Sequence, residues 1–482
     1  MKTIEEILDL TRPASAIISD LKNKQIFVPS WSSLEKKYDP MLHDIIKNRA
    51  LRPDDKRNDK GKIEKVAKLI YPAEKIAVRK MTQMCFTIPV KRDYKDVDNE
   101  EQKEFVRAVE KVYESNRIDG LNYKRFKAFF ACCEMCTIWF PVDTKKVHYK
   151  YGFPTTIKLR CKTYTPMPQA KSGLPQAYMY PIFDAFDDLV AFSIEYDVVL
   201  PDRSKEKHFE CYTADKVFFW IDKGSGQGWE LSQDDNNVPI GKIQLSYIYD
   251  AEPLYNDISI DRDEIEFNKS RQSDLIRKNS RPIMKVIGKI LGQKPVGDTT
   301  REVYEMAEGG DIGVVAPPLN VDASIKHTDN LKKDIEESTQ MPNLALENIK
   351  SLSGVVSGEA RKTLLSDAHL KVGEKKHDLI WFLDREMSVV KSLVAELNVQ
   401  WRKYVDTTTC YNIITPFVQN DERSEIENRK TANGGKPIES QLESIQRFDR
   451  SSDPEQTYNA IKQEEKESAE TARMESIFTG AE

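Results

Sequence analysis

The sequence predicts an α+β fold in which a mixed helical and β-rich body carries two long polar helices and one very long helix. Three observations predict this fold. Segments with apolar residues at helical spacing fill residues 1–140, and short alternating runs separated by turn signals fill residues 141–250. Helical patterns return after residue 254. A chain of 482 residues is long enough for several domains or for one elongated subunit of several parts.

Composition excludes several classes of protein. With 39% hydrophobic and 31% charged residues, the chain is expected to fold with an extensively solvated surface. No apolar run approaches the roughly 20 residues that a membrane helix needs, and the N-terminus lacks the apolar core of a signal peptide. We therefore expect no membrane partner and assembly in a cytoplasm. Seven cysteines, an odd number at irregular spacing, indicate reduced thiols.

The net charge of −5 argues against a tight, sequence-independent nucleic-acid binder, because such affinity comes mainly from Lys and Arg neutralising phosphates. It does not exclude a protein that DNA passes, since strong phosphate contacts would slow the movement.

The first 140 residues are predicted to be largely helical. Helical pieces before residue 52 are broken by Pro13, Pro29 and Pro40, and the charged run 52–62 is expected to be a solvated loop. Three further helices are predicted, at residues 76–85, 99–117 and 122–136.

Two polar helices follow the β-rich region. The first is expected at residues 257–280 and the second at 327–339, with Thr328 or Asp329 as its N-cap. Between them lies a small β-containing insert, 282–318, with a short helical piece near 299–307. Neither helix has a wide apolar stripe, so each is expected to be stable only when packed among neighbouring subunits.

The longest helix is expected from Ser357, its N-cap, to about Tyr404, because apolar residues recur at spacings of three, four or seven. The bland loop SLSGVVSG leads into it. Four shorter elements complete the chain: a strand at 410–418 and helices at 421–433, 438–448 and 453–474.

A metal- or thiol-dependent enzyme built on Cys132, Cys133 and Cys136 is one functional alternative. Structural zinc usually needs a second pair of ligands, and no second Cys pair follows, so burial among the neighbouring aromatic residues is the favoured interpretation. The histidines His369 and His377 are interpreted as solvated helix residues.

Phosphate-binding loops and catalytic motifs are absent from the sequence: neither GxxxxGK[ST], GxGxxG nor GxSxG occurs. Acidic residues between Asp261 and Glu266 fit the positive end of a helix dipole without a metal. We therefore expect no catalytic residue, no bound metal and no cofactor, and a protein that is not an enzyme.

The order of the elements resembles that of the portal proteins of tailed bacteriophages. Four stretches carry the resemblance, in the family's order: KLIYPAEKIAVRKMTQMCFTIPVK, IQLSYIYDAEPLYNDISIDRDEIEFNKSRQSDLIRKNSRPIMKVIG, SGVVSGEARKTLL, and ITPFVQNDERSEIENRKTANGGKPIESQLESI followed by DPEQTYNAIKQEE. The third resembles the "SG-x-A" that opens the long helix after the family's tunnel loop.

The resemblance implies a portal-like subunit with an α/β wing, a helical stem, a small β-containing clip, a long kinked wing helix and a short helical crown. Carried over by position, the parts are the wing (1–256, helical to 140 and β-rich over 141–250), the first stem helix (257–281), the clip (282–325), the second stem helix (326–343), the tunnel loop (344–357), the long helix and wing return (358–433) and the crown (434–482).

The resemblance also implies a function and partners. The expected function is a ring, typically of twelve copies, at one capsid vertex of the virion, through which double-stranded DNA is packaged and ejected. The expected partners are further copies of the chain, the passing DNA, the terminase large subunit, the major capsid and scaffold proteins, and a head–tail adaptor. A head-assembly protein without a channel remains an alternative.

Three groups of site residues follow from the same resemblance. The tunnel loop is expected to line the DNA channel through Lys350, Ser351, Ser353, Gly354, Val355, Ser357 and Gly358. The stem is expected to line it through Asp261, Glu264, Arg271, Arg277, Lys332 and Lys333. The clip is expected to contact motor and adaptor through Lys285, Lys289, Lys294 and Arg301.

Overall fold

The computed structural model describes residues 3–57, 63–224, 226, 228–232, 236–238, 240–279, 283–288, 290–296, 301–307, 309–315, 321–341, 365–417, 440–448 and 454–479. The chain divides into two compact units. The main unit comprises residues 1–348 and 364–417, and the C-terminal unit comprises residues 349–363 and 418–482.

The N-terminal part of the main unit consists of short helices, as the prolines predict. These are α1 (Ile4–Ile7), α2 (Ala14–Leu21), α3 (Trp31–Tyr38), a 3-10 turn (Pro40–Leu42) and α4 (Asp44–Lys47). A two-stranded ribbon of β1 (Lys56–Arg57) and β2 (Ile63–Glu64) follows.

Three longer helices come next: α5 (Ala73–Phe86), α6 (Glu100–Ser115) and α7 (Ile118–Cys132), with β3 (Lys91–Lys95) between α5 and α6. The expected helix over 122–136 was wrong at its end. Cys133 adopts a left-handed conformation with φ of 62°, which ends α7, and the chain enters a strand at Glu134.

Two antiparallel sheets form the β-rich region, as the alternation predicts. The first has the order β12-β4-β5 and the second β10-β9-β8-β7-β6, with β11 also paired to β9. Their strands are β4 (Glu134–His148), β5 (Thr155–Tyr164), β6 (Tyr178–Phe183), β7 (Leu189–Val199), β8 (Lys205–Tyr212), β9 (Lys216–Asp222), β10 (Glu230–Leu231), β11 (Asn236–Asn237) and β12 (Leu245–Tyr249), and a one-turn helix α8 (Gln169–Ser172) links β5 to β6.

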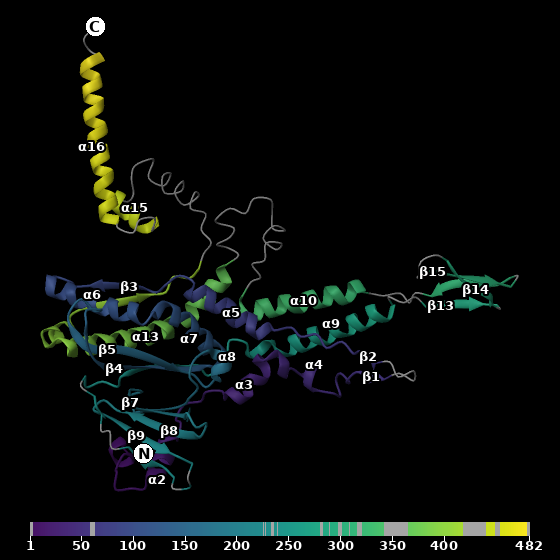
Figure 1. Cartoon of the computed structure of the whole chain (residues 1–482), viewed down its shortest axis with the longest axis horizontal. Helices are drawn as coiled ribbons and strands as arrows, with labels where there is room; N and C mark the ends of the chain where they lie inside the picture. The colour runs from purple at the N-terminus through teal and green to yellow at the C-terminus, as the bar shows by residue number, and fades with distance from the viewer. Residues whose placement is uncertain are drawn as a thin grey trace. The chain divides into compact units, whose positions relative to one another are not determined.

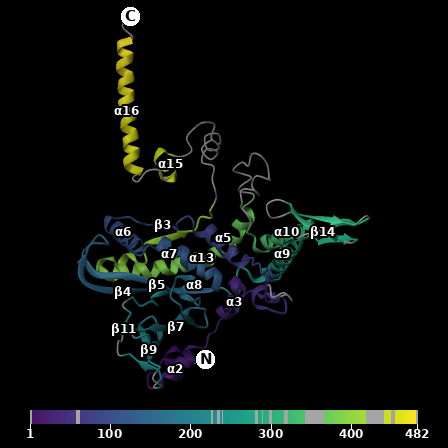
Figure 2. The same ribbon diagram turned by 45° about the vertical axis from the view of Figure 1, so that its right-hand side comes forward.

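The long helix α13 (Ser366–Leu397) organises the core of the main unit. It lies against α5, α6, β4, β5 and β12, and against β17 (Thr409–Ile413), which pairs with β3 (Figures 1 and 2). Its buried residues join those of α5 and α7 in one apolar cluster and those of α6 in another. The helix ends earlier than expected, because Asn398 is extended and its side chain accepts a hydrogen bond from the Gln400 amide, opening a 3-10 helix (Val399–Tyr404). The expected N-cap Ser357 lies outside the described residues.

Two long helices, α9 (Ser259–Asn279) and α10 (Val321–Thr339), lie side by side (Figures 1 and 2). Between them in sequence come two strand pairs, β13 (Ile283–Ile287) with β16 (Asp311–Val315) and β14 (Ile290–Val296) with β15 (Arg301–Met306). The predicted β insert is confirmed, but the short helix expected near 299–307 was wrong. This stretch forms the strand β15 instead and pairs with β14, because the β-branched Val303 and the aromatic Tyr304 favour a strand.

The start of the second polar helix was also wrong. α10 begins at Val321, and Thr328 lies inside it, with its hydroxyl donating to the carbonyl oxygen of Ser324 one turn earlier at 2.9 Å. A threonine that suits an N-cap can satisfy its hydroxyl in a helix interior in this way.

The C-terminal unit contains α15 (Gln441–Phe448) and α16 (Pro454–Thr479), close to the two helices expected there. The first begins with a reciprocal cap, in which the amides of Ser440 and Glu443 each donate to the other residue's side chain. The helix expected at 421–433 lies outside the described residues.

Candidate functional site

The candidate site is the stem hairpin, which we define as α9 and α10. Ile265 of α9 and Ile335 of α10 are buried, but polar contacts also join the helices. Gln272 Nε2 donates to Ser324 Oγ at 2.5 Å. Since few apolar side chains are available, most of the stability of α9 must come from other contacts.

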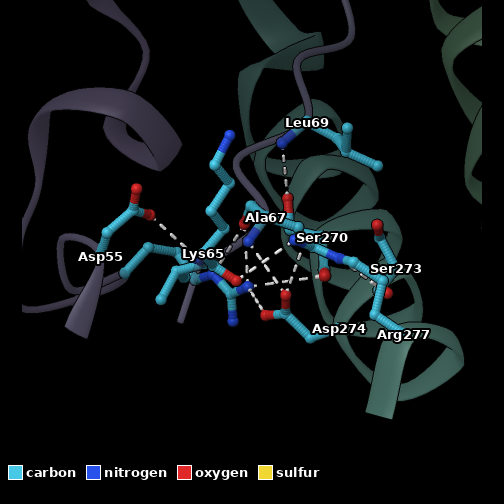
Figure 3. A network of polar contacts seen from close by, with 10 residues as sticks. Asp55, Lys65, Ala67, Leu69, Ser270, Ser273, Asp274 and Arg277 are labelled. Atoms are coloured by element: carbon cyan, nitrogen blue, oxygen red, sulfur yellow. Dashed lines mark hydrogen bonds and ion pairs between the residues drawn. The ribbon is translucent and has the colours of Figure 1, made fainter. Parts of the chain in front are cut away.

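An extended stretch, residues 65–71, provides those contacts by running along α9. We call it the anchoring segment. Four hydrogen bonds join its backbone to side chains of α9 (Figure 3 labels three of the pairs): Tyr71 N to Glu266 Oε1 at 2.7 Å, Leu69 N to Ser270 Oγ at 2.8 Å, Ala67 N to Asp274 Oδ1 at 2.9 Å, and Arg277 Nη1 to Lys65 O at 3.2 Å. The segment and the helix run antiparallel, and the amides of alternate residues are satisfied by the helix.

The spacing explains why this arrangement fits. Two residues of extended chain advance about 6.6 Å, and four residues of α-helix advance about 6.0 Å. Acceptor side chains at intervals of four, on Glu266, Ser270 and Asp274, therefore keep pace with every second amide of the segment. This spacing of acceptors on a helix without an apolar stripe was the signal in the sequence that could have revealed the contact.

Arg52 contacts both α9 and the anchoring segment. Its guanidinium forms an ion pair with Asp274 and donates to the carbonyl oxygen of Ala67 from Nη2 at 2.8 Å. The expectation that the charged run 52–62 is a solvated loop was therefore wrong at its first residue, because Arg52 is buried. An arginine can satisfy a carboxylate and a carbonyl oxygen together, which makes its burial possible.

A buried charged cluster lies at the root of the hairpin, where α9 meets α4 and α5. His43 Nδ1 is 2.7 Å from Glu266 Oε1, and His43 Nε2 is 2.9 Å from the carbonyl oxygen of Lys37. Arg262 Nε is 3.5 Å from Glu74 Oε1. Burial raises the pKa of Glu74, and Arg262 opposes that shift only partly. The root is thus a place where charges are held out of water.

The other end of α10 is held by Lys80 of α5. Its ammonium donates to the carbonyl oxygen of Met341 at 3.0 Å, just after the helix ends and Gln340 turns into a left-handed conformation. The Met341 side chain is buried in the same apolar cluster as Leu365 and Ala368 of the long-helix region. The residues on both sides of the stretch 342–364 are therefore fixed in one core.

The expected stem residues divide between two faces of α9. Glu264 and Arg271 are exposed, and they share a face with the exposed Ile260 and Leu275 because successive members are four or seven residues apart, about one or two helical turns. Arg277 belongs to the other face, where it donates to Asp274 Oδ1 at 2.8 Å as well as to the anchoring segment.

The remaining stem residues are less exposed or lie on α10. Asp261 is half-buried in the first turn of α9. Lys332 forms an ion pair with Asp329 at 2.7 Å, and Lys333 is exposed. In the part of the chain that the structure describes, the expected stem residues of a single copy do not form one cluster.

Of the expected clip residues, Lys285 is exposed on β13. Lys294 lies on β14 opposite Val303, and Arg301 lies on β15 opposite Val296. Lys289 lies outside the described residues. So do all seven residues of the expected tunnel loop: Lys350, Ser351, Ser353, Gly354, Val355, Ser357 and Gly358.

The three clustered cysteines lie in the core, as the favoured interpretation predicted. Cys132, Cys133 and Cys136 are free and buried, and Cys132 Sγ donates to the carbonyl oxygen of Glu134 at 3.2 Å. Burial raises the pKa of the Cys132 thiol to about 12, which keeps it protonated and unreactive. Within the described ranges, no group of three or more His, Cys, Asp or Glu side chains is arranged to hold a metal ion.

Among the helices of the described residues, none combines the length and the apolar character needed to cross a bilayer.

Comparison with known proteins gives one family. The family model described as "Phage portal protein, SPP1 Gp6-like" matches residues 21–471. Two solved structures that resemble the chain are "Neck of empty GTA particle computed with C6 symmetry" and "Virion of native gene transfer agent (GTA) particle". Each is 9% identical and covers 85% of this chain and 93% of the other, with TM-scores of 0.40 and 0.36. No curated protein matches the chain.

Proposed function

The chain belongs to the SPP1 Gp6-like phage portal proteins, a structural family, and on that premise we propose that its copies form a ring around a channel for double-stranded DNA. The resemblance to other portal proteins implies that the ring contains twelve copies and lies at one vertex of the capsid. The ring serves DNA packaging and ejection, and it performs no covalent chemistry. Assembly takes place in the host cytoplasm.

The observation that carries the proposal is the family match over nearly the whole chain. The stem hairpin supports it. A channel wall must keep its shape under load, and α9 is held on one face by the anchoring segment and along its length by α10. Its remaining exposed face carries both charges, on Glu264 and Arg271, so moving DNA is neither strongly attracted nor strongly repelled.

We assign the parts of the chain as the resemblance implies. The wing is 1–256 with 358–433, the stem 257–281 and 326–343, the clip 282–325, the tunnel loop 344–357 and the crown 434–482. Glu264, Arg271 and Lys333 are proposed to line the channel, with Asp261 and Lys332 behind them. Arg277 is instead proposed to be an anchoring residue.

The clip is proposed to dock the terminase large subunit and the head–tail adaptor through Lys285, Lys289, Lys294 and Arg301. The wing is proposed to contact the major capsid and scaffold proteins. Lys294→Glu is expected to weaken motor or adaptor docking before it affects ring formation. Unchanged docking would place the clip boundary elsewhere.

Electron microscopy of the purified chain tests the proposal. Rings with a central hole wide enough for a DNA duplex are expected, and assembled particles carrying Ser353→Asp and Val355→Asp are expected to package less DNA. Closed rings without a hole would favour the alternative of a head-assembly protein without a channel. Absence of rings across salt and protein concentrations, alone or with scaffold protein, would contradict the proposal.

A further inference from the structure

The outer face of α13 carries exposed apolar residues that its own core does not use. Leu370 is 68% exposed and Trp381 is 60% exposed, and both lie on one face because eleven residues are just over three full turns. Gly373 and His377 lie between them and are exposed too. Nothing comes within 4 Å of a Cβ atom built at Gly373, so an approaching chain can contact the helix backbone there.

The same face is acidic. Four exposed carboxylates surround the apolar residues: Asp367, Glu374, Asp378 and Asp384. The lysines of this helix lie toward its flanks, where Lys375 is paired with Asp250 at 2.5 Å and Lys371 with Glu374 at 2.7 Å. A partner of this face should therefore present apolar side chains together with positive charge. We call residues 367–384 the acidic face.

A surface with those properties exists at the far end of the β4–β5 ribbon. Asp143 pairs with Ile157 and His148 with Thr155, so residues 144–147 of β4 bulge out opposite the single residue 156 of β5. Hydrogen bonds fix the bulge: Thr144 Oγ1 donates to Thr156 O at 2.7 Å, and the Lys145 amide donates to Asp143 Oδ1 at 2.9 Å. Bulges of this kind re-aim side chains out of the plane of the ribbon.

The bulge presents basic and apolar side chains in alternation. Lys145 and Lys146 are exposed, Val147 is 62% exposed and Tyr149 is 70% exposed. Lys145 takes a left-handed conformation with φ of 55°, which a residue with a side chain rarely adopts. A strained, hydrogen-bonded bulge that exposes a valine, with an exposed tyrosine just after the strand, is a candidate contact surface for another chain. We call residues 144–150 the basic bulge.

We propose that the basic bulge of one copy docks on the acidic face of the next copy around the ring. The inference rests on the proposed ring and names a contact within it. A closed ring joins each copy to its neighbours through two different surfaces, and these two surfaces match in charge and in apolar content. Val147 and Tyr149 pack between Leu370 and Trp381, over Gly373, and Lys146 pairs with Asp378.

Another exposed apolar side chain, Phe186, shows why charge selects this pairing. Phe186 is 86% exposed at the tip of the β6–β7 hairpin, but Asp184, Asp187 and Asp188 surround it. That acidic hairpin would be repelled by the acidic face of α13. It could compete for the basic bulge, but it offers one apolar side chain, and Asp184 Oδ1 already accepts bonds from its own turn.

Charge reversal on the full-length chain tests the contact. Lys146→Glu and Asp378→Lys, made singly, are each expected to raise the concentration needed for half-maximal ring assembly about tenfold or more, because like charges then face each other. The double variant is expected to restore assembly to within about threefold of the unaltered chain. Asp187→Lys is the matched control and should leave assembly unchanged. Mass photometry measures assembly, and thermal melting checks that each variant is folded.

A photo-crosslinking residue in place of Tyr149 identifies the neighbour directly. Crosslinks between copies to peptides containing residues 366–384 are expected. Crosslinks to residues 184–188, to DNA or to another virion protein would overturn the inference, as would single reversals that assemble normally or a double variant no better than either single. Rings that form normally in those variants leave the portal assignment intact, whereas failure of the unaltered chain to form rings contradicts both.

Discussion

The core around α13 and the stem hairpin are stabilised in different ways. Around α13, large apolar and aromatic side chains such as Phe126 and Phe382 pack with ring centroids 5.6 Å apart. Along α9, the contacts are instead hydrogen bonds from backbone amides to side chains one helical turn apart. Apolar burial is non-directional, whereas these hydrogen bonds fix the position of one chain along another. Apolar burial thus stabilises the core around α13, whereas directional hydrogen bonds align the chains in the stem hairpin.

The core around α13 nevertheless contains a buried ion pair. Arg125 of α7 and Glu386 of α13 have side chains 0% and 1% exposed, and two hydrogen bonds of 2.7 and 2.6 Å join them. Trp139 Nε1 also donates to Glu386 at 2.9 Å. These hydrogen bonds hold the long helix against α7 and β4 at one fixed position. Directional polar contacts, like those along α9, thus also occur inside an apolar core.

Breaking that pair should give the largest effect. Glu386→Ala leaves the buried guanidinium of Arg125 without its carboxylate, with Thr137 Oγ1 at 3.1 Å as its remaining acceptor, and removes the acceptor of the Trp139 indole N–H. We therefore expect a loss of about 3–5 kcal/mol in the free energy of unfolding. Chemical denaturation followed by tryptophan fluorescence measures it. The double variant Arg125→Met with Glu386→Leu should recover the part of the loss that comes from the unpaired charge, since apolar groups then replace both charges, while the Trp139 indole N–H still lacks its acceptor. A double variant as unstable as Glu386→Ala would show that the two residues do not act as a pair.

Breaking the anchoring segment should have a smaller, local effect. Asp274→Ala removes the partner of Arg52 and the acceptor of the Ala67 amide, and we expect about 2–3 kcal/mol of lost local stability. Hydrogen exchange at the amides of Ala67 and Leu69 measures it, while exchange in α13 should stay unchanged. Arg271→Ala, on another face of the same helix, is the control. Equal loss of protection in α13 would contradict the separation of the two regions.

The difference between the regions also explains what could be predicted from the sequence. Apolar periodicity located α5, α6 and most of α13, and alternation located the two sheets, because both patterns record burial. The anchoring segment left no apolar pattern, and the one signal of it in the sequence is the four-residue spacing of acceptors on α9. Its contacts depend on the backbone of residues 65–71, whose side chains carry no information about the bonds of their amides. Nor could spacing reveal that Arg125 pairs with a residue 261 positions later.

The functional residues were predicted from resemblance more than from chemistry. Glu264 and Arg271 lie on α9 and are exposed, and their place in the wall of a channel stays a prediction. Arg277 was placed with them because charge alone does not show whether a side chain faces outward or binds a neighbouring backbone. The prediction that the charged run beginning at Arg52 is a solvated loop was wrong at that residue for the same reason, since the burial of an arginine depends on partners distant in sequence.

The smallest expected effect concerns Glu74 at the root of the stem. Burial raises its pKa in the folded chain above the ordinary value of 4.5. The folded chain therefore binds more protons than the unfolded chain between those two pKa values, and the free energy of unfolding falls as pH rises through that window. Below pH 4.5 Glu74 is protonated in both the folded and the unfolded chain, and the cost of burying a charged carboxylate disappears. Glu74→Gln should thus be more stable than the unaltered chain at pH 7, with the difference shrinking as the pH is lowered toward 4.5.

Melting temperatures of the two chains from pH 4.5 to 7.5 test this, with Glu264→Gln as the control, because that glutamate is exposed. Arg262 keeps Asp263 as a partner at 3.1 Å, so the substitution does not leave its charge alone. A variant that is less stable than the unaltered chain at pH 7 would show that the Glu74–Arg262 attraction outweighs the cost of burying the carboxylate. The root of the stem would then be stabilised by its charges, as the anchoring segment is, and the contrast between wing and stem would extend into the boundary between them.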